Sequence, residues 1–354
     1  MKLYKKWVIA FLAVNATIFA LITAFMYIVD PLQYYRPITF YKPSYRYHER
    51  LAIPGIVRNH DFDAIIIGSS TSQNARPSKV DELFGVRCVK FAAAGASAKE
   101  LSLFFEEAVE RKKIKMVIQG LDLFAYAGPP DRLRTEYPHY LYQLTPSTFY
   151  KYFYDGYILK KTLTKIDWLT AFDSKTYAFD HDVFAADKIT KKPSRRKLVG
   201  SFFNPDYNRT YCYVNFIRDS KENFRRNVVR IALKNPDTKF YFHFIPSSIL
   251  DWVTRDRHGD LPQLFELRSF IAEECSKLEN VRLYDFQADE DITHNLDIYF
   301  DISHYDPTIN DLIISKIHAD SHRTNPEKCK QANTEIRQQV ETFKKEVLPT
   351  LKQK

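Results

Sequence analysis

Residues 64–72 read AIIIGSSTS, and this stretch decides the fold. The run from Ala64 to Ile67 is short and wholly apolar, which is typical of a strand buried on both faces. Gly68 allows the chain to bend, and Ser69, Ser70 and Thr71 follow at once. Two interpretations fit: a strand and turn in which Ser69 or Ser70 caps the next helix, or a serine presented at the carboxyl end of a strand, where α/β sheets place their sites.

The rest of the chain repeats this strand pattern and alternates it with helical patterns. Short apolar runs predict five strands, at 64–68, 86–92, 115–120, 239–245 and 281–286. Apolar residues at helical spacing predict helices at 97–111, 221–234 and 264–278. Alternating helices and wholly apolar strands indicate βαβ units. We therefore expect an α/β protein, a three-layer α/β/α sandwich with a flavodoxin-like parallel sheet.

The first thirty residues have the pattern of a membrane anchor. Lys2, Lys5 and Lys6 precede an apolar run from Trp7 to Val29, which as a helix would be roughly 30–35 Å long and would cross the hydrocarbon core. Lysines ahead of the run favour a cytoplasmic amino end. A cleaved signal peptide and a buried core helix are the alternatives, but the run is long and Asp30 follows it instead of a small-residue cleavage site. We expect one transmembrane helix.

The predicted boundaries follow from these patterns. Residues 1–30 form the cytoplasmic start and anchor, and the aromatic, basic stretch 31–60 is a membrane-proximal connector with a short helix into Asn59. Residues 61–322 form the α/β domain, interrupted between the third and fourth strands by an insertion at 125–220 without strand pattern. Residues 323–354 form a polar helical tail, which would pack on the domain or bind a partner helix.

Composition narrows the class of protein. The 354 residues are 45% hydrophobic, which excludes a disordered chain. The formal net charge is +9, and a basic run spans Lys188–Lys197, yet no nucleic-acid-binding motif surrounds it, so we expect no nucleic-acid partner. The four cysteines contain no C-x-x-C pair, and the sequence leaves open whether they form disulfides or stay free.

Residues suited to acyl chemistry follow the predicted strands. Ser70 follows the first strand, Gly95 the second and Asp122 the third, and Asp301 and His304 lie late in the chain as D-x-x-H. A serine hydroxyl needs a base, which His304 can be, and Asp301 can orient the imidazole. The backbone N–H groups of Ser70 and Gly95 would form an oxyanion hole. Such a triad requires no metal or cofactor, and we expect none.

These blocks, GSS, AAAGAS, GLDL and DISH, resemble those of the SGNH (GDSL-type) hydrolase superfamily. The second serine occupies the nucleophile position, which selects Ser70 over Ser69. With its membrane anchor, the chain is similar to the envelope branch of that superfamily, which works in D-alanylation of teichoic acids and O-acetylation of alginate. The resemblance covers about 60–125 and 235–320. It implies an acyltransferase or esterase on an envelope polysaccharide or acylated polymer, a multi-span membrane acyltransferase as partner, and a bacterial inner-membrane location with the domain outside the cytoplasm.

One position departs from the family pattern. Asp122 stands near the place where an asparagine amide would donate to the oxyanion, and an ionised carboxylate donates no hydrogen bond. Either Asp122 is protonated, or two backbone donors suffice, or Asp122 holds a loop. The departure keeps a second hypothesis open, a non-catalytic SGNH-fold scaffold that binds glycan and recruits an acyltransferase.

A metal centre is a third hypothesis. His294, Asp297, Asp301 and His304 fall within one short stretch, and His243 lies on another predicted strand. Histidine and carboxylate side chains are ligands that zinc or a hard metal ion takes in proteins. The spacing matches no familiar ligand motif, so the triad is the favoured interpretation.

Overall fold

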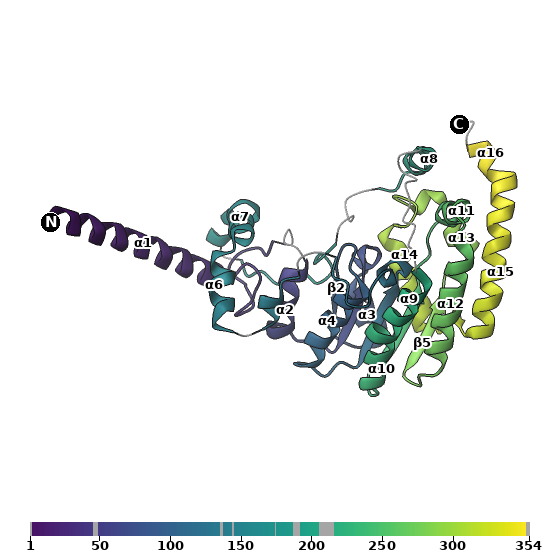
Figure 1. The fold of residues 1–354 in the computed structure, drawn as a ribbon, viewed down its shortest axis with the longest axis horizontal. Helices are drawn as coiled ribbons and strands as arrows, with labels where there is room; N and C mark the ends of the chain where they lie inside the picture. Colours follow the sequence, from purple (N-terminus) through teal and green to yellow (C-terminus); the bar gives the residue numbers. More distant parts are fainter. Residues whose placement is uncertain are drawn as a thin grey trace. The chain divides into compact units, whose positions relative to one another are not determined.

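The computed structural model describes residues 2–44, 49–134, 137–143, 145–173, 175–186, 192–204 and 216–351. The chain divides into two compact units. The first combines Met1–Asp61 with Tyr137–Asp180, and the second combines Phe62–Glu136 with His181–Lys354 (Figure 1). Residues 137–180, the middle of the predicted insertion, therefore belong to the same unit as the amino-terminal segment. The sheet and the two ends of the insertion belong to the other unit.

The second unit is built on a mostly parallel sheet, as expected for an α/β protein. Among the described residues the sheet has six strands in the order β2-β1-β3-β4-β5-β6, of which only β6 is antiparallel. The order of the first five strands is the flavodoxin-like one. The strands are β1 Ala64–Gly68, β2 Cys88–Ala92, β3 Met116–Leu121, β4 Lys239–Phe244, β5 Val281–Asp285 and β6 Arg323–Thr324.

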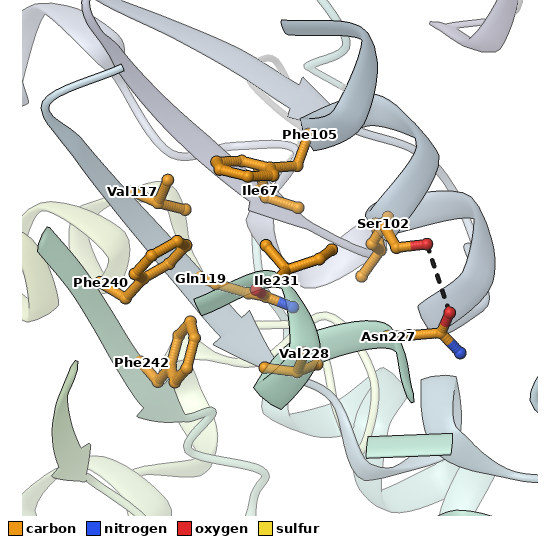
Figure 2. Close-up of a pocket in the computed structure, with 11 residues that line it drawn as sticks. Ile67, Ser102, Phe105, Val117, Gln119, Asn227, Val228, Ile231, Phe240 and Phe242 are labelled. Carbon is orange, nitrogen blue, oxygen red and sulfur yellow. Dashed lines mark hydrogen bonds between the residues drawn. The ribbon is translucent and has the colours of Figure 1, made fainter. Parts of the chain in front are cut away.

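One face of the sheet packs against α4 (Ala98–Val109) and against a continuous helix that contains a π-helical turn. The latter runs through α9 (Phe216–Phe224), η4 (Arg225–Val229) and α10 (Arg230–Lys234). A capping box at Ser97 and Glu100 starts α4. Strand and helix side chains enclose a small cavity of about 10 Å³. Figure 2 shows its lining residues, with the Ser102 hydroxyl bonded to Asn227. The cavity has room for about one water molecule, so this face is a packed core.

The opposite face is covered by other helices. The ring of Phe84, at the end of α3 (Pro77–Phe84), lies 5.7 Å from that of Tyr241 on β4 and 5.0 Å from that of His318 on α14 (Pro307–His318). Tyr241 alternates with Phe240 and Phe242, which face the cavity. Because both faces are covered, most side chains of the first five strands are buried, and apolar residues predominate in them.

The polar tail packs on the same unit. It forms α15 (Pro326–Thr342), a π-helical turn η6 (Phe343–Val347) and α16 (Leu348–Leu351). Asn333 on α15 accepts a 2.6 Å hydrogen bond from the buried Arg268 of α12 (Leu261–Ser276). Arg268 also pairs with Asp285, so the tail is tied to the end of β5. The remaining elements of this unit are η1 Ser70–Ser72, η2 Leu123–Tyr126, α8 Arg195–Phe203, α11 Ile249–Arg257, α13 Glu290–Thr293 and η5 Leu296–Ile298.

The first unit is organised around α1 (Lys2–Val29). Within it, Tyr4–Val29 is long and apolar enough to cross a membrane. Asp30 follows the helix and is fully buried; it accepts hydrogen bonds from the backbone N–H groups of Tyr34 and Tyr35 and from the Tyr152 hydroxyl. Burial raises the pKa of Asp30, against the lowering effect of these donors. The other elements are α2 Glu49–Asn59, α5 His139–Tyr142, α6 Pro146–Tyr154, α7 Gly156–Lys165 and η3 Trp168–Phe172.

The cysteines are free where they are described. Cys88, Cys275 and Cys329 are buried thiols without a disulfide, and burial raises the pKa of each. Cys212 and part of the basic run at 188–197 lie outside the described residues.

Candidate functional site

The turn after β1 explains why a strand ends in Gly68 and two serines. The chain enters the short 3-10 helix η1 at Ser70, and this tucks the Ser72 side chain back against the strand end. A Cβ atom at Gly68 would collide with the Ser72 hydroxyl, so Gly68 is required for space and not for a bend. Ser72 is buried while Ser70 is half-buried. The turn therefore directs the Ser72 hydroxyl into the core and leaves the Ser70 hydroxyl partly exposed to solvent.

The structure brings Ser70 and His304 together, although 234 positions separate them in the chain. The Ser70 Oγ atom lies 2.8 Å from Nε2 of His304. This distance is within hydrogen-bond reach for a serine and its general base.

His304 is in turn held by Asp301. Both carboxylate oxygens of Asp301 lie 2.8 Å from Nδ1 of the imidazole. Since an ionised carboxylate only accepts hydrogen bonds, Nδ1 carries the proton and Nε2 is left as an acceptor. The Ser70 hydroxyl then donates to Nε2, which is the protonation state that a general base needs.

Local structure fixes the D-x-x-H segment. A β-bridge pairs Tyr299 with Tyr305, and the N–H of Phe300 donates to the carbonyl of His304 at 2.8 Å. Within the closed loop, the N–H groups of Ser303 and His304 donate to Oδ1 of Asp301. One short segment thus supplies both the carboxylate and the imidazole in fixed orientation.

The environment keeps Asp301 ionised. Partial burial alone would raise its pKa, but the hydrogen bond from His304, the positive charge of that ring when it is protonated, and the two backbone donors hold the pKa well below its usual range. An ionised Asp301 favours the imidazolium that forms when His304 takes a proton.

Asp122 is engaged as an acceptor. Its Oδ2 accepts a 2.8 Å hydrogen bond from the Ser69 hydroxyl, and its Oδ1 accepts from the N–H of Phe124, where it caps η2. Ser69 stands at the start of η1 but makes no side-chain cap there. Of the three roles considered for Asp122, holding a loop fits these contacts, because Asp122 links the turns after β1 and β3. A carboxylate already occupied by two donors supplies none to an oxyanion.

Gly95 lies in the turn after β2 with a φ of 57°, a conformation that glycine adopts without strain. That turn is next to Ser70 in the sheet, because Gly68 pairs with Ala92 and the N–H of Ala93 donates to the carbonyl of Gly68. Among the described residues, the N–H groups of Ser70 and Gly95 donate no hydrogen bond to protein. Both remain available to an oxyanion.

Arg134 is a candidate that sequence analysis missed. Its guanidinium lies over Gly95: a Cβ atom at Gly95 would be 2.5 Å from Nη1. The same group lies 5.5 Å from the ring centroid of Phe124, whose backbone N–H donates to Asp122. Within the described part of the chain, Arg134 has no carboxylate at ion-pair distance. The only signal in the sequence was an arginine in a loop without pattern.

The proposed metal ligands do not converge. His294 lies against Thr293 and Phe343, while His243 is buried on β4, where burial lowers its pKa to about 4. The side chain of Asp297 is exposed and 3.9 Å from Arg195. In the described ranges, no group of three or more His, Cys, Asp or Glu side chains could hold a metal ion.

Comparison with known proteins finds no relative of this chain. A scan against protein-family models, a search of curated proteins and a search of solved structures each find no match.

Proposed function

We propose that the protein is a membrane-anchored, SGNH-like serine acyltransferase or esterase that acts on acyl esters of a cell-envelope glycan or lipid-linked polymer. The observation that carries the proposal is the chain of hydrogen bonds from Ser70 through His304 to Asp301. Nucleophile, base and orienting carboxylate are the three parts of a serine acyl-transfer site.

The reaction follows from the protonation states. Ser70 Oγ attacks the acyl carbonyl while its proton moves to Nε2 of His304. The oxyanion accepts from the N–H groups of Ser70 and Gly95. When the ester bond breaks, His304 returns the proton to the leaving alcohol. Water or a glycan hydroxyl then attacks the acyl-serine and loses its proton to His304, which returns that proton to Ser70 Oγ as the acyl group leaves. Water as the attacking group makes the protein an esterase, and a glycan hydroxyl makes it a transferase.

The fold and the anchor support the finer parts of the proposal. Helices packed on both sheet faces support a three-layer sandwich, and the strand order is consistent with the SGNH type. A single apolar helix after lysines is consistent with a bacterial inner-membrane protein whose amino end is cytoplasmic and whose domain lies outside. There a multi-span acyltransferase would deliver acyl groups.

A fluorophosphonate probe tests the proposal directly. Because such probes react with an activated serine, the folded full chain should be labelled. Folded protein that is not labelled would favour the alternative, a non-catalytic scaffold that binds glycan and recruits an acyltransferase. The observation in favour of this alternative is that Asp122 supplies a carboxylate where the family pattern has an amide donor.

We further propose that Arg134 compensates for the missing amide donor by placing positive charge beside Gly95. Replacing Arg134 by glutamine should slow probe labelling about tenfold to a hundredfold, because one donor to an oxyanion is typically worth about a hundredfold or more and Arg134 is exposed. Arg134→Lys should recover part of the rate. The measurement is the rate of labelling at fixed probe concentration.

Arg282 provides the matched control for Arg134. It is a half-exposed arginine near the start of β5, at the opposite edge of the sheet from the carboxyl ends of the strands. Arg282→Gln should leave the labelling rate unchanged. Equal rates in Arg134→Gln and Arg282→Gln would remove Arg134 from the site.

A further inference from the structure

Within the first unit, α6 contacts α1 inside its apolar segment. The ring of Tyr154 packs edge-on against Phe19 with centroids 5.2 Å apart, and its hydroxyl lies 2.5 Å from Oγ1 of Thr23. Phe19 is ten residues before Val29, or about 15 Å along the helix. The apolar segment Tyr4–Val29 is about 39 Å long, about 9 Å more than the roughly 30 Å of a hydrocarbon core, and this excess is less than the distance from Phe19 to the end of the helix. If α1 spans a bilayer, part of α6 must therefore lie at the depth of the lipid interface.

Large apolar side chains of the same unit are exposed beside these contacts. Leu169 and Phe172 on η3 are 82% and 87% exposed, the highest fractions among the large hydrophobic residues of the described chain. We define the interfacial surface as these two residues with the exposed apolar side chains of α6 and α7, namely Phe149, Tyr150, Tyr157 and Leu163. Such exposure in a single unit is unusual for residues in contact with water only.

The surroundings of this surface have the composition of a membrane interface. Trp168 packs against Phe25 of α1 at 5.7 Å, and Tyr35 stacks on Phe149 at 5.8 Å. Arg36 donates to the carbonyls of Tyr27 and Ile28 at the end of α1. Tryptophan and tyrosine concentrate at headgroup level, and arginine reaches from there to polar groups. Lysines interspersed with the apolar residues complement lipid phosphates; they are Lys151, Lys160, Lys161 and Lys165.

We propose that α6, α7 and η3 contact a phospholipid bilayer around the end of α1. The interfacial surface that they carry inserts into the headgroup region. The inference rests on α1 spanning the membrane and is independent of the Ser70 site. Lipid is favoured over a protein partner because α6 and η3, which carry much of the surface, contact the apolar segment of α1, and because the surface combines aromatic, aliphatic and lysine side chains.

Fluorescence quenching in reconstituted vesicles tests this surface. The full chain, with Trp7, Trp168 and Trp252 replaced by phenylalanine, carries a single reporter as Leu169→Trp. Vesicles contain phosphatidylglycerol and phosphatidylcholine brominated either near the headgroup or near the chain ends. We expect strong quenching of Leu169→Trp, greater with bromine near the headgroup, because an interfacial side chain lies shallow in the bilayer.

Leu233→Trp in the same background is the matched control. Leu233 is an exposed leucine on α10 in the sheet unit, and it should be quenched several times less. Phe172→Trp provides a second reporter if Leu169→Trp does not fold, as judged by circular dichroism. If both interfacial reporters are quenched no more than Leu233→Trp, the surface does not contact lipid, and a protein partner becomes its occupant.

Discussion

Ser70→Ala should abolish fluorophosphonate labelling while the protein stays folded and inserted. The Ser70 Oγ atom is the one hydroxyl within 2.8 Å of Nε2 of His304 among the described residues, so its removal leaves the base without a nucleophile. Removing a triad serine typically costs about a millionfold in rate, which is below detection for a probe. The change deletes one half-buried oxygen, so the free energy of unfolding should change by less than about 1 kcal/mol.

Ser69→Ala is the matched control, because it removes the neighbouring hydroxyl. Ser69 donates to Asp122 and does not contact His304. This variant loses the link between two turns and should label more slowly, yet the probe should still attach at residue 70, as mapped by mass spectrometry. Persistent labelling of Ser70→Ala, or an adduct on Ser69 in the wild type, would contradict the choice of nucleophile.

The sheet could be predicted from the sequence because its signal is local. The five predicted strands are short, largely apolar runs: 64–68 coincides with β1, and the other four agree with the structure within two residues at either end. The two-residue β6 has no apolar run and was not predicted. The α/β class and the mostly parallel sheet are confirmed. The D-x-x-H segment was also readable, because a turn three residues long suffices to place Asp301 against His304.

The first unit could not be predicted, because the residues that contact each other in it are far apart in the sequence and show no periodic pattern. The bond from Tyr152 to Asp30 joins residues 122 positions apart, and nothing in either segment specifies the other. The sequence therefore gave no sign that residues 137–180 of the insertion form one unit with the amino-terminal segment. Arg134 escaped for the same reason: its position over Gly95 depends on how two loops meet.

Asp301→Asn should slow labelling about a thousandfold or more, and the hydrogen bonds explain why an uncharged near-isostere fails. Oδ1 of Asp301 accepts from the N–H groups of Ser303 and His304, so the carbonyl oxygen of an asparagine would occupy that position. Its NH₂ group would then replace Oδ2, which lies 2.8 Å from Nδ1 of His304. Oδ1 is also 2.8 Å from Nδ1, but the two backbone donors already occupy its two lone pairs. A donor at this place favours the tautomer with the proton on Nε2, and that imidazole cannot accept the proton of Ser70.

The pH dependence of the free energy of unfolding distinguishes loss of the Asp301 charge from general unfolding of the variant. Because the native pKa of Asp301 is depressed, its ionised form stabilises the fold at pH above the ordinary value of about 3.9, and this contribution is lost as pH falls through the native pKa. Asp301→Asn should therefore be less stable than the wild type at neutral pH, and the difference should vanish in acid. Asp306→Asn, which alters only the cap of α14, should label at nearly the wild-type rate. Equal labelling of Asp301→Asn and Asp306→Asn would show that the carboxylate does not orient His304 for proton transfer, and the relay would lose its third member.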